Sequence, residues 1–489
     1  MPIDFPTLNV MALAPELVVI ITAVVVMLFD MFVADKRVMG YVSLLGLAGA
    51  ALVSLFLFGD APAIQNMAVS DGYSLVLNLV FIVTAALSIL VALGYLADRD
   101  IHYGEYYTLI LFSTAGMMLM GAATDLIVVF LGLEIMSIGL YILAAFNRRQ
   151  AASGEAGLKY FILGAFASAF FLYGVALLYG ATGTTNLQAI GDWFTPERGN
   201  MGDPLALTGL GLLIIGFAFK VAAVPFQWWT PDVYHGAPTS VTAFMSVGAK
   251  AAGFAALIRI LMISFGQVFT VDWQIAVAVL AVITMTGGNI AALAQKDVKR
   301  MLAYSSIAHA GYILVGVVPG TMAGVNGVLF YLMAYAFMNI GAFAVISVLE
   351  QREAIGTDLS SYAGLSKYKP FLALAMGLFM FSLTGIPPFV GFWGKLYVFR
   401  AAVEANMSWL AIVGMVNSAI SAFYYLSVVV QMYMRTPDGD EILETDSPSA
   451  VINLPAPVTV ALAVTVTATI ILGVWPTPLV NLASFGLFG

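Results

Sequence analysis

The sequence predicts an all-α polytopic membrane protein with about 14 transmembrane helices. Apolar residues make up 61% of its 489 residues and charged residues only 9%, whereas a soluble globular protein carries about 25% charged residues. The mean hydropathy is +0.98. Apolar runs of roughly 20 residues, the length that a helix needs to cross a bilayer, follow one another with short connectors. No stretch is left over for a separate soluble domain.

Apolar runs bounded by charged residues, glycine or proline define the expected helices. The first seven lie near residues 12–33, 38–58, 74–97, 106–122, 125–146, 155–181 and 204–230. The second seven lie near residues 238–265, 272–293, 299–318, 322–348, 369–405, 408–434 and 457–475. The first run has Asp4 and Glu16 at its start in place of a basic region, which indicates a permanent helix and not a cleaved signal.

The seventh and twelfth runs are longer than one span, and both contain proline. Lys220 precedes Pro225 by five residues, and Lys395 follows Pro388 by seven. A proline inside a membrane helix frees backbone groups that lipid cannot satisfy. An over-long span with a central break is typical of a discontinuous helix at a functional site.

These two breaks also suggest an internal repeat, because Pro225-Phe226 and Pro388-Phe389 lie 163 positions apart and each has a tryptophan nearby. Helices four to eight and nine to thirteen then form two five-helix units. Five is an odd number, so consecutive units must be inverted in the membrane. The expected organisation is a three-helix segment, a first repeat, a second inverted repeat, and an acidic connector with helix 14, at residues 1–105, 106–265, 272–434 and 435–489.

The orientation follows from the basic residues, which are enriched in cytoplasmic loops. We number each loop by the predicted helix that it follows. Even-numbered loops hold only Arg198 and Arg400. Odd-numbered loops hold Lys36, Arg37, Arg99, Arg148, Arg149, Lys296, Lys299, Arg300, Arg352, Lys367, Lys369 and Arg435. We therefore expect odd loops in the cytoplasm and both termini on the outer side.

Composition also limits the chemistry of the chain. It contains no cysteine, which excludes thiolate-bound iron–sulfur clusters and disulfides. Its three histidines are His102, His235 and His309, and the first two are expected at helix ends, so a bis-histidine haem is not expected. No nucleotide-binding motif occurs. We expect no metal site and no redox chemistry within this chain.

Four ionisable residues lie deep inside predicted helices. Glu134 is nine residues past Asp125, which places it about 14 Å into the fifth helix. Lys220 lies at the break of the seventh helix, Lys250 in the eighth, and Lys395 in the second half of the twelfth. A charge at the centre of a membrane helix costs about 2.5 to 3.5 kcal/mol on insertion scales and usually marks a functional site.

Two interpretations compete for these four residues. Glu134 and one lysine could form a structural ion pair that holds two helices together. One carboxylate cannot neutralise three lysines, however, and burial favours the neutral amine. Lysines poised between charged and neutral forms, linked by water at the broken helices, would make a proton relay along the membrane plane. We favour the relay.

Several other residues are candidates for smaller roles. Lys159 follows Glu155 by four residues, a spacing that favours an ion pair on one helix face; alternatively, it modulates Glu134. His309 lies among hydroxyl residues and glycines in the tenth helix, so packing and a relay role are both open. His235 is a candidate for proton uptake near the cytoplasmic surface. Arg259 is expected to extend its charge to the membrane interface.

Five segments resemble a known family most clearly, and the resemblance covers essentially the whole chain. They are LGLEIMSIGLYILAAF (131–146), KYFILGAFASAFFLYGVALLYGATG (159–183), KVAAVPFQWWTPDVYHGAPTSVTAF (220–244), KDVKRMLAYSSIAHAGY (296–312) and TGIPPFVGFWGKLYVF (384–399). They are similar to the antiporter-like membrane subunits of the proton-pumping NADH-quinone oxidoreductase, respiratory complex I. One member of that family has a lateral-helix extension, which we do not expect here because the sequence ends soon after the last predicted helix, and another carries glutamate where this chain has Lys395.

The resemblance implies a proton-translocating membrane-arm subunit that couples electron transfer from NADH to quinone to proton pumping. It assigns Glu134 and Lys220 as a pair, Lys250 as the central lysine and Lys395 as the terminal one. The chain would be a non-redox part of a translocase, with flavin, iron–sulfur clusters and quinone in partner subunits. Expected partners are the other membrane-arm subunits, including another antiporter-like one, and lipids, but no nucleic acid. The expected location is the bacterial inner membrane, with both termini periplasmic.

Two other function classes remain open at this stage. Large subunits of multi-subunit sodium/proton antiporters share the fold that the resemblance implies, so a cation/proton antiporter is the main alternative. The chain could also be a scaffold without a transport role. The subunit composition of the native complex would separate the first two classes.

Overall fold

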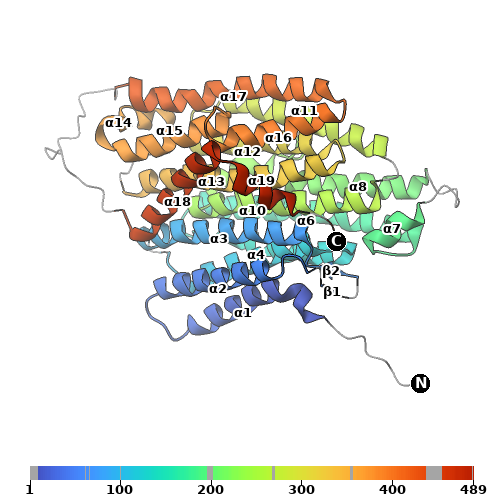
Figure 1. Ribbon diagram of the computed structural model, residues 1–489. Helices are drawn as coiled ribbons and strands as arrows, with labels where there is room; N and C mark the ends of the chain where they lie inside the picture. Colours follow the sequence, from blue (N-terminus) through green and yellow to red (C-terminus); the bar gives the residue numbers. More distant parts are fainter. Residues whose placement is uncertain are drawn as a thin grey trace.

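In the computed structural model, helices run roughly parallel and antiparallel across one bundle (Figure 1). The structure describes residues 9–60, 62–64, 66–99, 101–194, 202–266, 270–352, 356–436, 454–486 and 488. The acidic residues 438–446 of the expected connector, and Arg198, lie outside these described residues.

The elements follow the apolar runs of the sequence closely. In the first half they are η1 (Val10–Leu13), α1 (Ala14–Phe29), α2 (Arg37–Phe56), β1 (Ala63–Ile64), β2 (Ala68–Val69), α3 (Gly72–Asp98), α4 (Gly104–Ala122), α5 (Leu126–Ala144), α6 (Ala151–Thr182), α7 (Leu187–Trp193), α8 (Pro204–Lys220) and α9 (Trp229–Gly236). In the second half they are α10 (Thr239–Ser264), α11 (Thr270–Leu293), α12 (Val298–Val317), α13 (Met322–Arg352), η3 (Leu359–Tyr362), α14 (Leu365–Tyr368), α15 (Pro370–Thr384), α16 (Val390–Glu404), α17 (Ser408–Met434), α18 (Ala456–Val474) and α19 (Thr477–Ser484).

The prediction of a mostly helical, polytopic membrane protein is confirmed. In the part of the chain that the structure describes, ten helices are long and apolar enough to cross a membrane. They are α1, α2, α3, α5, α6, α10, α11, α13, α17 and α18. The count of fourteen spans, the inverted repeat and the four-part organisation of the chain stay predictions.

Small elements that the sequence did not reveal lie in the connectors. The two-residue strands β1 and β2 pair antiparallel, with Ala63 opposite Val69 and Ile64 opposite Ala68. The short helices α7, α14 and α19 also lie outside the predicted runs. These elements are too short to show the periodicity on which sequence prediction depends.

Burial divides the helices into a centre and a rim. In their most apolar segments, α10 and α13 have 89% and 94% of residues buried, whereas α17 and α18 have 33% each. In Figure 1, α10 and α13 lie inside the bundle, with α1 and α2 along one edge and α17 along the other. Rim helices expose large apolar side chains, such as Leu45 and Phe423, and an apolar rim of this kind suits contact with lipid.

Both proline-containing runs are divided into two helices. α8 ends at Lys220, the peptide bond between Val224 and Pro225 is cis, and α9 begins at Trp229. α15 ends at Thr384, the bond between Pro387 and Pro388 is cis, and α16 begins at Val390. At the second break the chain turns at Gly385, whose φ of 90° suits glycine because it has no Cβ. Each break places a lysine beside free helix ends.

Candidate functional site

The predicted relay begins at Glu134 on α5. This helix is capped by Asp125, whose carboxylate accepts a hydrogen bond of 2.8 Å from the backbone of Ile127. Glu134 lies half-buried, and Oε1 accepts a hydrogen bond of 2.5 Å from Ser168 on α6. Its neighbour Ile135 is exposed. Glu134 therefore lies at the rim of the bundle, with its charge only partly enclosed by this chain.

Lys220, the last residue of α8, is only 2% exposed. Its Nζ donates a hydrogen bond of 2.6 Å to Ser137 Oγ and lies 3.5 Å from the hydroxyl of Tyr141. The ammonium group also lies 5.4 Å from the ring centre of Tyr141 and 5.8 Å from that of Tyr160. The C-terminal end of a helix favours a positive charge. These contacts hold Lys220 without a carboxylate.

Glu134 and Lys220 are close, but they do not form a direct ion pair among the described residues. Ser137, which lies one helical turn past Glu134 on α5, accepts a hydrogen bond from Lys220. Ser168 donates a hydrogen bond to the carboxylate of Glu134. The pair implied by the family is therefore separated in this structure. Each of the two groups is hydrogen-bonded to a serine hydroxyl instead.

An aromatic column connects Lys220 to Lys250. Tyr160 stacks on Trp229 with ring centres 4.4 Å apart, and Trp229 meets the edge of Tyr234 at 6.0 Å. The ring of Tyr234 lies 5.9 Å from Nζ of Lys250. The break between α8 and α9 thus brings Trp229 and Tyr234 between two buried lysines.

Lys250 on α10 is 2% exposed and reaches α12. Its Nζ donates to the backbone oxygen of Ser306 at 2.6 Å and lies 2.5 Å from the hydroxyl of the same residue. Among the described residues, no carboxylate forms an ion pair with Lys250. Its partners are neutral, so they can accept a hydrogen bond from either the charged or the neutral amine.

His309 continues this line along α12, and it is 1% exposed. Its Nδ1 lies 2.6 Å from the hydroxyl of Tyr331, and Nε2 lies 2.9 Å from that of Tyr425. The hydroxyl of Tyr425 is also bonded to Ser305, the residue before the partner of Lys250. Both ring nitrogens of His309 are therefore in a hydrogen-bonded chain, as a proton-transfer role requires.

Lys395 on α16 ends the row and is 4% exposed. Its Nζ donates to the backbone oxygen of Thr384 and to Ser418 Oγ, each at 2.8 Å. Nζ lies 4.7 Å from the ring centre of Tyr312, and that ring meets the edge of His309 with centres 5.7 Å apart. The second break contributes directly, because Thr384 is the last residue of α15 and offers its carbonyl oxygen.

Sequence reasoning missed the hydroxyl partners of the lysines: Ser137, Ser306 and Ser418. It also missed the two tyrosines that hold His309, at positions 331 and 425. One signal was present on α12, where Ser305, His309 and Tyr312 follow one another at spacings of four and three and therefore share a helix face. No such signal identifies a partner on another helix.

A second group of charges lies at one end of the bundle. Lys159 is 2.7 Å from Glu155 and 2.7 Å from Asp232, and Asp232 is 3.0 Å from Arg300. The ion pair predicted from the four-residue spacing is thus present, and Asp232 joins it. These groups line an open pocket of about 140 Å³ together with His235. Lys159 contacts neither Glu134 nor Lys220 in the hydrogen bonds and ion pairs of the described residues.

His235 and Asp232 are partly exposed in this pocket. His235 Nε2 lies 3.6 Å from Asp297 Oδ2. Burial raises the pKa of the Asp232 carboxyl, but hydrogen bonds from Lys159 and Arg300, together with their charges, lower it by more, so this pKa lies below its ordinary value. The pocket is a polar, solvent-accessible site beside the helix break.

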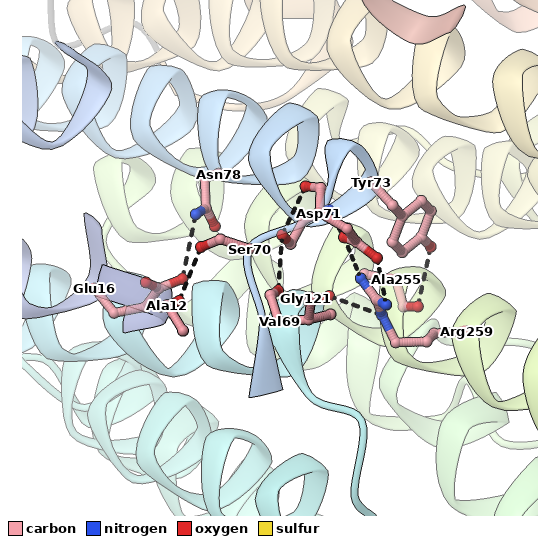
Figure 2. Close-up of polar contacts among 11 residues, drawn as sticks. Ala12, Glu16, Val69, Ser70, Asp71, Tyr73, Asn78, Gly121, Ala255 and Arg259 are labelled. Atoms are coloured by element: carbon pink, nitrogen blue, oxygen red, sulfur yellow. Dashed lines mark hydrogen bonds and ion pairs between the residues drawn. The ribbon is translucent and has the colours of Figure 1, made fainter. Parts of the chain in front are cut away.

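The prediction that Arg259 extends to the membrane interface is wrong. Arg259 is 1% exposed, and its two terminal nitrogens each donate a 2.8 Å hydrogen bond to an oxygen of Asp71 (Figure 2). Nε donates to the backbone oxygen of Gly121 at 3.0 Å. The bidentate contact satisfies the charge in place. The sequence showed only that Arg259 lies near a helix end. It could not show that Asp71, on a distant part of the chain, faces Arg259.

Comparisons with known proteins agree with this architecture. Residues 123–421 match the family described as NADH:quinone oxidoreductase/Mrp antiporter, TM. NADH-quinone oxidoreductase subunit N of Trichlorobacter lovleyi is 46% identical over 482 residues, which cover 98% of this chain and 97% of the relative.

Two solved structures are also similar. A chain of respiratory complex I from Thermus thermophilus with bound aureothin is 34% identical, with a TM-score of 0.78 over 96% of this chain and 99% of that one. A chain of the Mrp complex from Dietzia sp. has a TM-score of 0.83 over 97% and 96% of the two chains, at 22% identity. The second likeness is one of fold alone. From the family match and the near-complete coverage at 46% identity, this chain belongs to the antiporter-like membrane subunits of NADH:quinone oxidoreductase.

Proposed function

We propose that this chain is a proton-translocating membrane-arm subunit of an NADH-quinone oxidoreductase, driven through its partners by electron transfer from NADH to quinone. The observation that carries the proposal is the row formed by Lys220, Lys250 and Lys395. All three are at most 4% exposed, and hydroxyl and carbonyl oxygens accept their hydrogen bonds. A buried lysine without a fixed counter-charge changes protonation state readily.

Proton transfer along this row uses groups that both donate and accept. The hydroxyls of Tyr425 and Ser305 connect His309 to the residue beside the partner of Lys250. The hydroxyl of Tyr160, between Lys220 and Lys250, is buried without a hydrogen-bond partner among the described residues. A buried polar atom of this kind is a place where water can bind and complete a path. Flavin, iron–sulfur and quinone chemistry would belong to partner subunits.

Glu134 would act as the control point of the row. It lies at the rim, and its carboxylate is hydrogen-bonded to Ser168 and not to Lys220 in this structure. A movement of α5 or of an adjoining subunit that brings the carboxylate to Lys220 would favour the charged lysine, and separation would favour release of the proton. The rim position suits contact with a neighbouring antiporter-like subunit.

We further propose fourteen spans. Four further spans would complete the count: α4, α12, the divided run of residues 204–230 that begins with α8, and the divided run of α15 with α16. This count supports two inverted five-helix repeats, with both termini periplasmic in a bacterial inner membrane. Protons would then be taken up from the cytoplasm near the pocket that contains Lys159, Asp232 and His235.

The test is Lys220→Ala in the complete complex reconstituted in liposomes, with Lys36→Met as the control. Lys36 forms an ion pair with Asp30 outside the row. We expect the Lys220 variant to assemble but to lose proton pumping and the coupled NADH oxidation, while the control keeps both. Wild-type pumping in the Lys220 variant would defeat the relay assignment.

A second candidate function is that of a cation/proton antiporter subunit. It is favoured by the breadth of the matching family and by the similar fold of the Mrp complex chain. The relatives at higher identity favour the first candidate. Purification of the native complex separates them, since redox subunits accompany the chain only in the first case.

A further inference from the structure

A buried carboxyl group lies outside the lysine row, between α1 and α3. Glu16, in the first turn of α1, is 2% exposed, and Asn78 on α3 is fully buried. Glu16 Oε1 accepts a hydrogen bond of 3.2 Å from Asn78 Nδ2. Figure 2 shows the two side chains meeting in the space between these helices.

Each member of this contact retains one unsatisfied oxygen. Glu16 Oε2 and Asn78 Oδ1 are both buried, and neither has a hydrogen-bond partner among the described residues. An ionised carboxylate and an amide oxygen are both acceptors, so they cannot satisfy one another. Buried polar atoms are nearly always paired, and two such atoms at one contact require a donor.

The contact also lacks a counter-charge. Within the described part of the chain, no ion pair involves Glu16. The arginine drawn in the same view, Arg259, is held by both oxygens of Asp71. Ser70, which lies between the two contacts in Figure 2, donates to the backbone oxygen of Ala12. The neighbouring charges are therefore already matched to each other.

The start of α1 gives a carboxylate limited help. Helix N-termini favour negative charge through free backbone N–H groups. Here the 3₁₀ helix η1 leads directly into α1, the N–H of Ala14 bonds to Met11, and Pro15 has no N–H. Of the N–H groups at this helix end, that of Glu16 itself acts on the carboxylate, so the helix end compensates the charge only in part.

We propose that Glu16 and Asn78 form a proton-binding site. A proton taken from water binds to Glu16 Oε2, and the resulting O–H donates to Asn78 Oδ1 while Oε1 continues to accept from Nδ2. The acid and the amide then satisfy each other through two hydrogen bonds, and the carboxyl is neutral. The only covalent change is formation of one O–H bond, which breaks when the proton returns to water.

Other ligands satisfy the same oxygens less completely. A water molecule would supply two donors, but it would leave the negative charge buried. A metal cation would supply charge, but hard cations take six or more oxygen ligands, and this contact offers two unpaired ones. One proton meets both requirements.

The site is placed for exchange with the surface. Val10 and Met11, within two turns of Glu16, are more than half exposed. The inference does not depend on the proposed function, because it concerns a different helix pair and uses none of the lysines.

Infrared spectroscopy of the complete complex tests the site, by subtraction of Glu16→Gln spectra from wild-type spectra over a pH series. Glutamine has the size of the neutral acid and can donate to Asn78. We expect the C=O stretch of a protonated carboxylic acid at neutral pH, with a shift in heavy water. Carboxylate bands should replace it as the pH is raised through neutrality and above. The matched control is Glu105→Gln on α4, an exposed first-turn glutamate, whose difference spectrum should lack the buried-acid band assigned to Glu16.

Two outcomes overturn the proposal. One is a spectrum of Glu16 that shows carboxylate bands and no acid band at both neutral and mildly acidic pH, and a shift of those bands upon exchange of sodium for lithium would identify a bound cation instead. A second variant, Asn78→Leu, retains Glu16 and removes its amide partner. Its spectrum should show the acid band at higher wavenumber than wild type, and an unchanged band would overturn the acid–amide pair even if Glu16→Gln failed to assemble.

Discussion

Lys220 donates its short hydrogen bond to Ser137, 2.6 Å away, and not to Glu134, which lies one helical turn earlier on α5. Glu134 is instead bonded to Ser168 on α6. The hydroxyl of Ser137 therefore fixes the position of the Lys220 ammonium group while the Glu134 carboxylate is bonded to Ser168.

Ser137→Ala should weaken this resting position. A hydrogen bond to a charged group contributes about 1.5 to 3 kcal/mol, so the variant should slow proton pumping at least several-fold while the complex still assembles. The rate of proton uptake by liposomes during NADH oxidation measures the effect. Thr182→Ala, which removes a hydroxyl bonded within α6, is the control. Equal rates in both variants would contradict a role for Ser137.

Lys250→Met should abolish pumping without loss of stability. Methionine replaces the amine by an apolar group of similar length, and removing a buried charge that has no counter-charge is often neutral or stabilising. The proton-pumping rate of the complex should therefore fall to background, while its thermal unfolding midpoint stays at or above the wild-type value. A scaffold role predicts the opposite, namely poor assembly with normal turnover per assembled complex.

Arg259→Met should destabilise the chain strongly, because it removes the guanidinium that contacts both oxygens of the buried Asp71 carboxylate. Loss of one partner of a buried pair costs about 3 to 5 kcal/mol. The double variant Arg259→Met with Asp71→Asn should recover most of this loss, since no charge then remains and asparagine can still accept the cap hydrogen bond from the backbone N–H of Ser74. Arg259→Lys should restore little, because lysine cannot form the two parallel hydrogen bonds. Additive effects in the double variant, measured from unfolding midpoints, would mean that the pair is not coupled.

Asp232→Asn should lower stability by an amount that is constant between about pH 6 and 8. The hydrogen bonds from Lys159 and Arg300 keep the pKa of Asp232 below its ordinary value of 3.8. A carboxyl whose pKa is lowered stabilises the fold above its ordinary pKa and loses that contribution as the pH falls through the lowered one. Because the group is partly exposed, the difference should not exceed about 1 kcal/mol. A difference that varies across neutral pH would show that another group titrates in the pocket.

Much of the fold could be predicted from the sequence because the bilayer imposes strong rules. Backbone groups in lipid must be paired within each segment, so long apolar runs become helices and their bounds are visible. Proline removes a donor and ends a helix, which is why Pro225 and Pro388 marked the two places where the chain divides. The sequence also identified three buried lysines, Lys220, Lys250 and Lys395. A charged residue within an apolar run becomes buried when that run packs against other helices.

Only the tertiary structure decided which groups these residues meet. Helical periodicity gives the face on which a side chain lies, but not the helix that covers that face. Ser306 meets Lys250 from 56 residues away, and Asp71 meets Arg259 from 188 residues away. The same limit applied to Glu16, which the sequence presented as a mark of a helix start, and which the packing of α3 enclosed against Asn78. Composition and chain order thus determined the membrane helices and their buried charges, and packing between distant helices determined how each charge is satisfied.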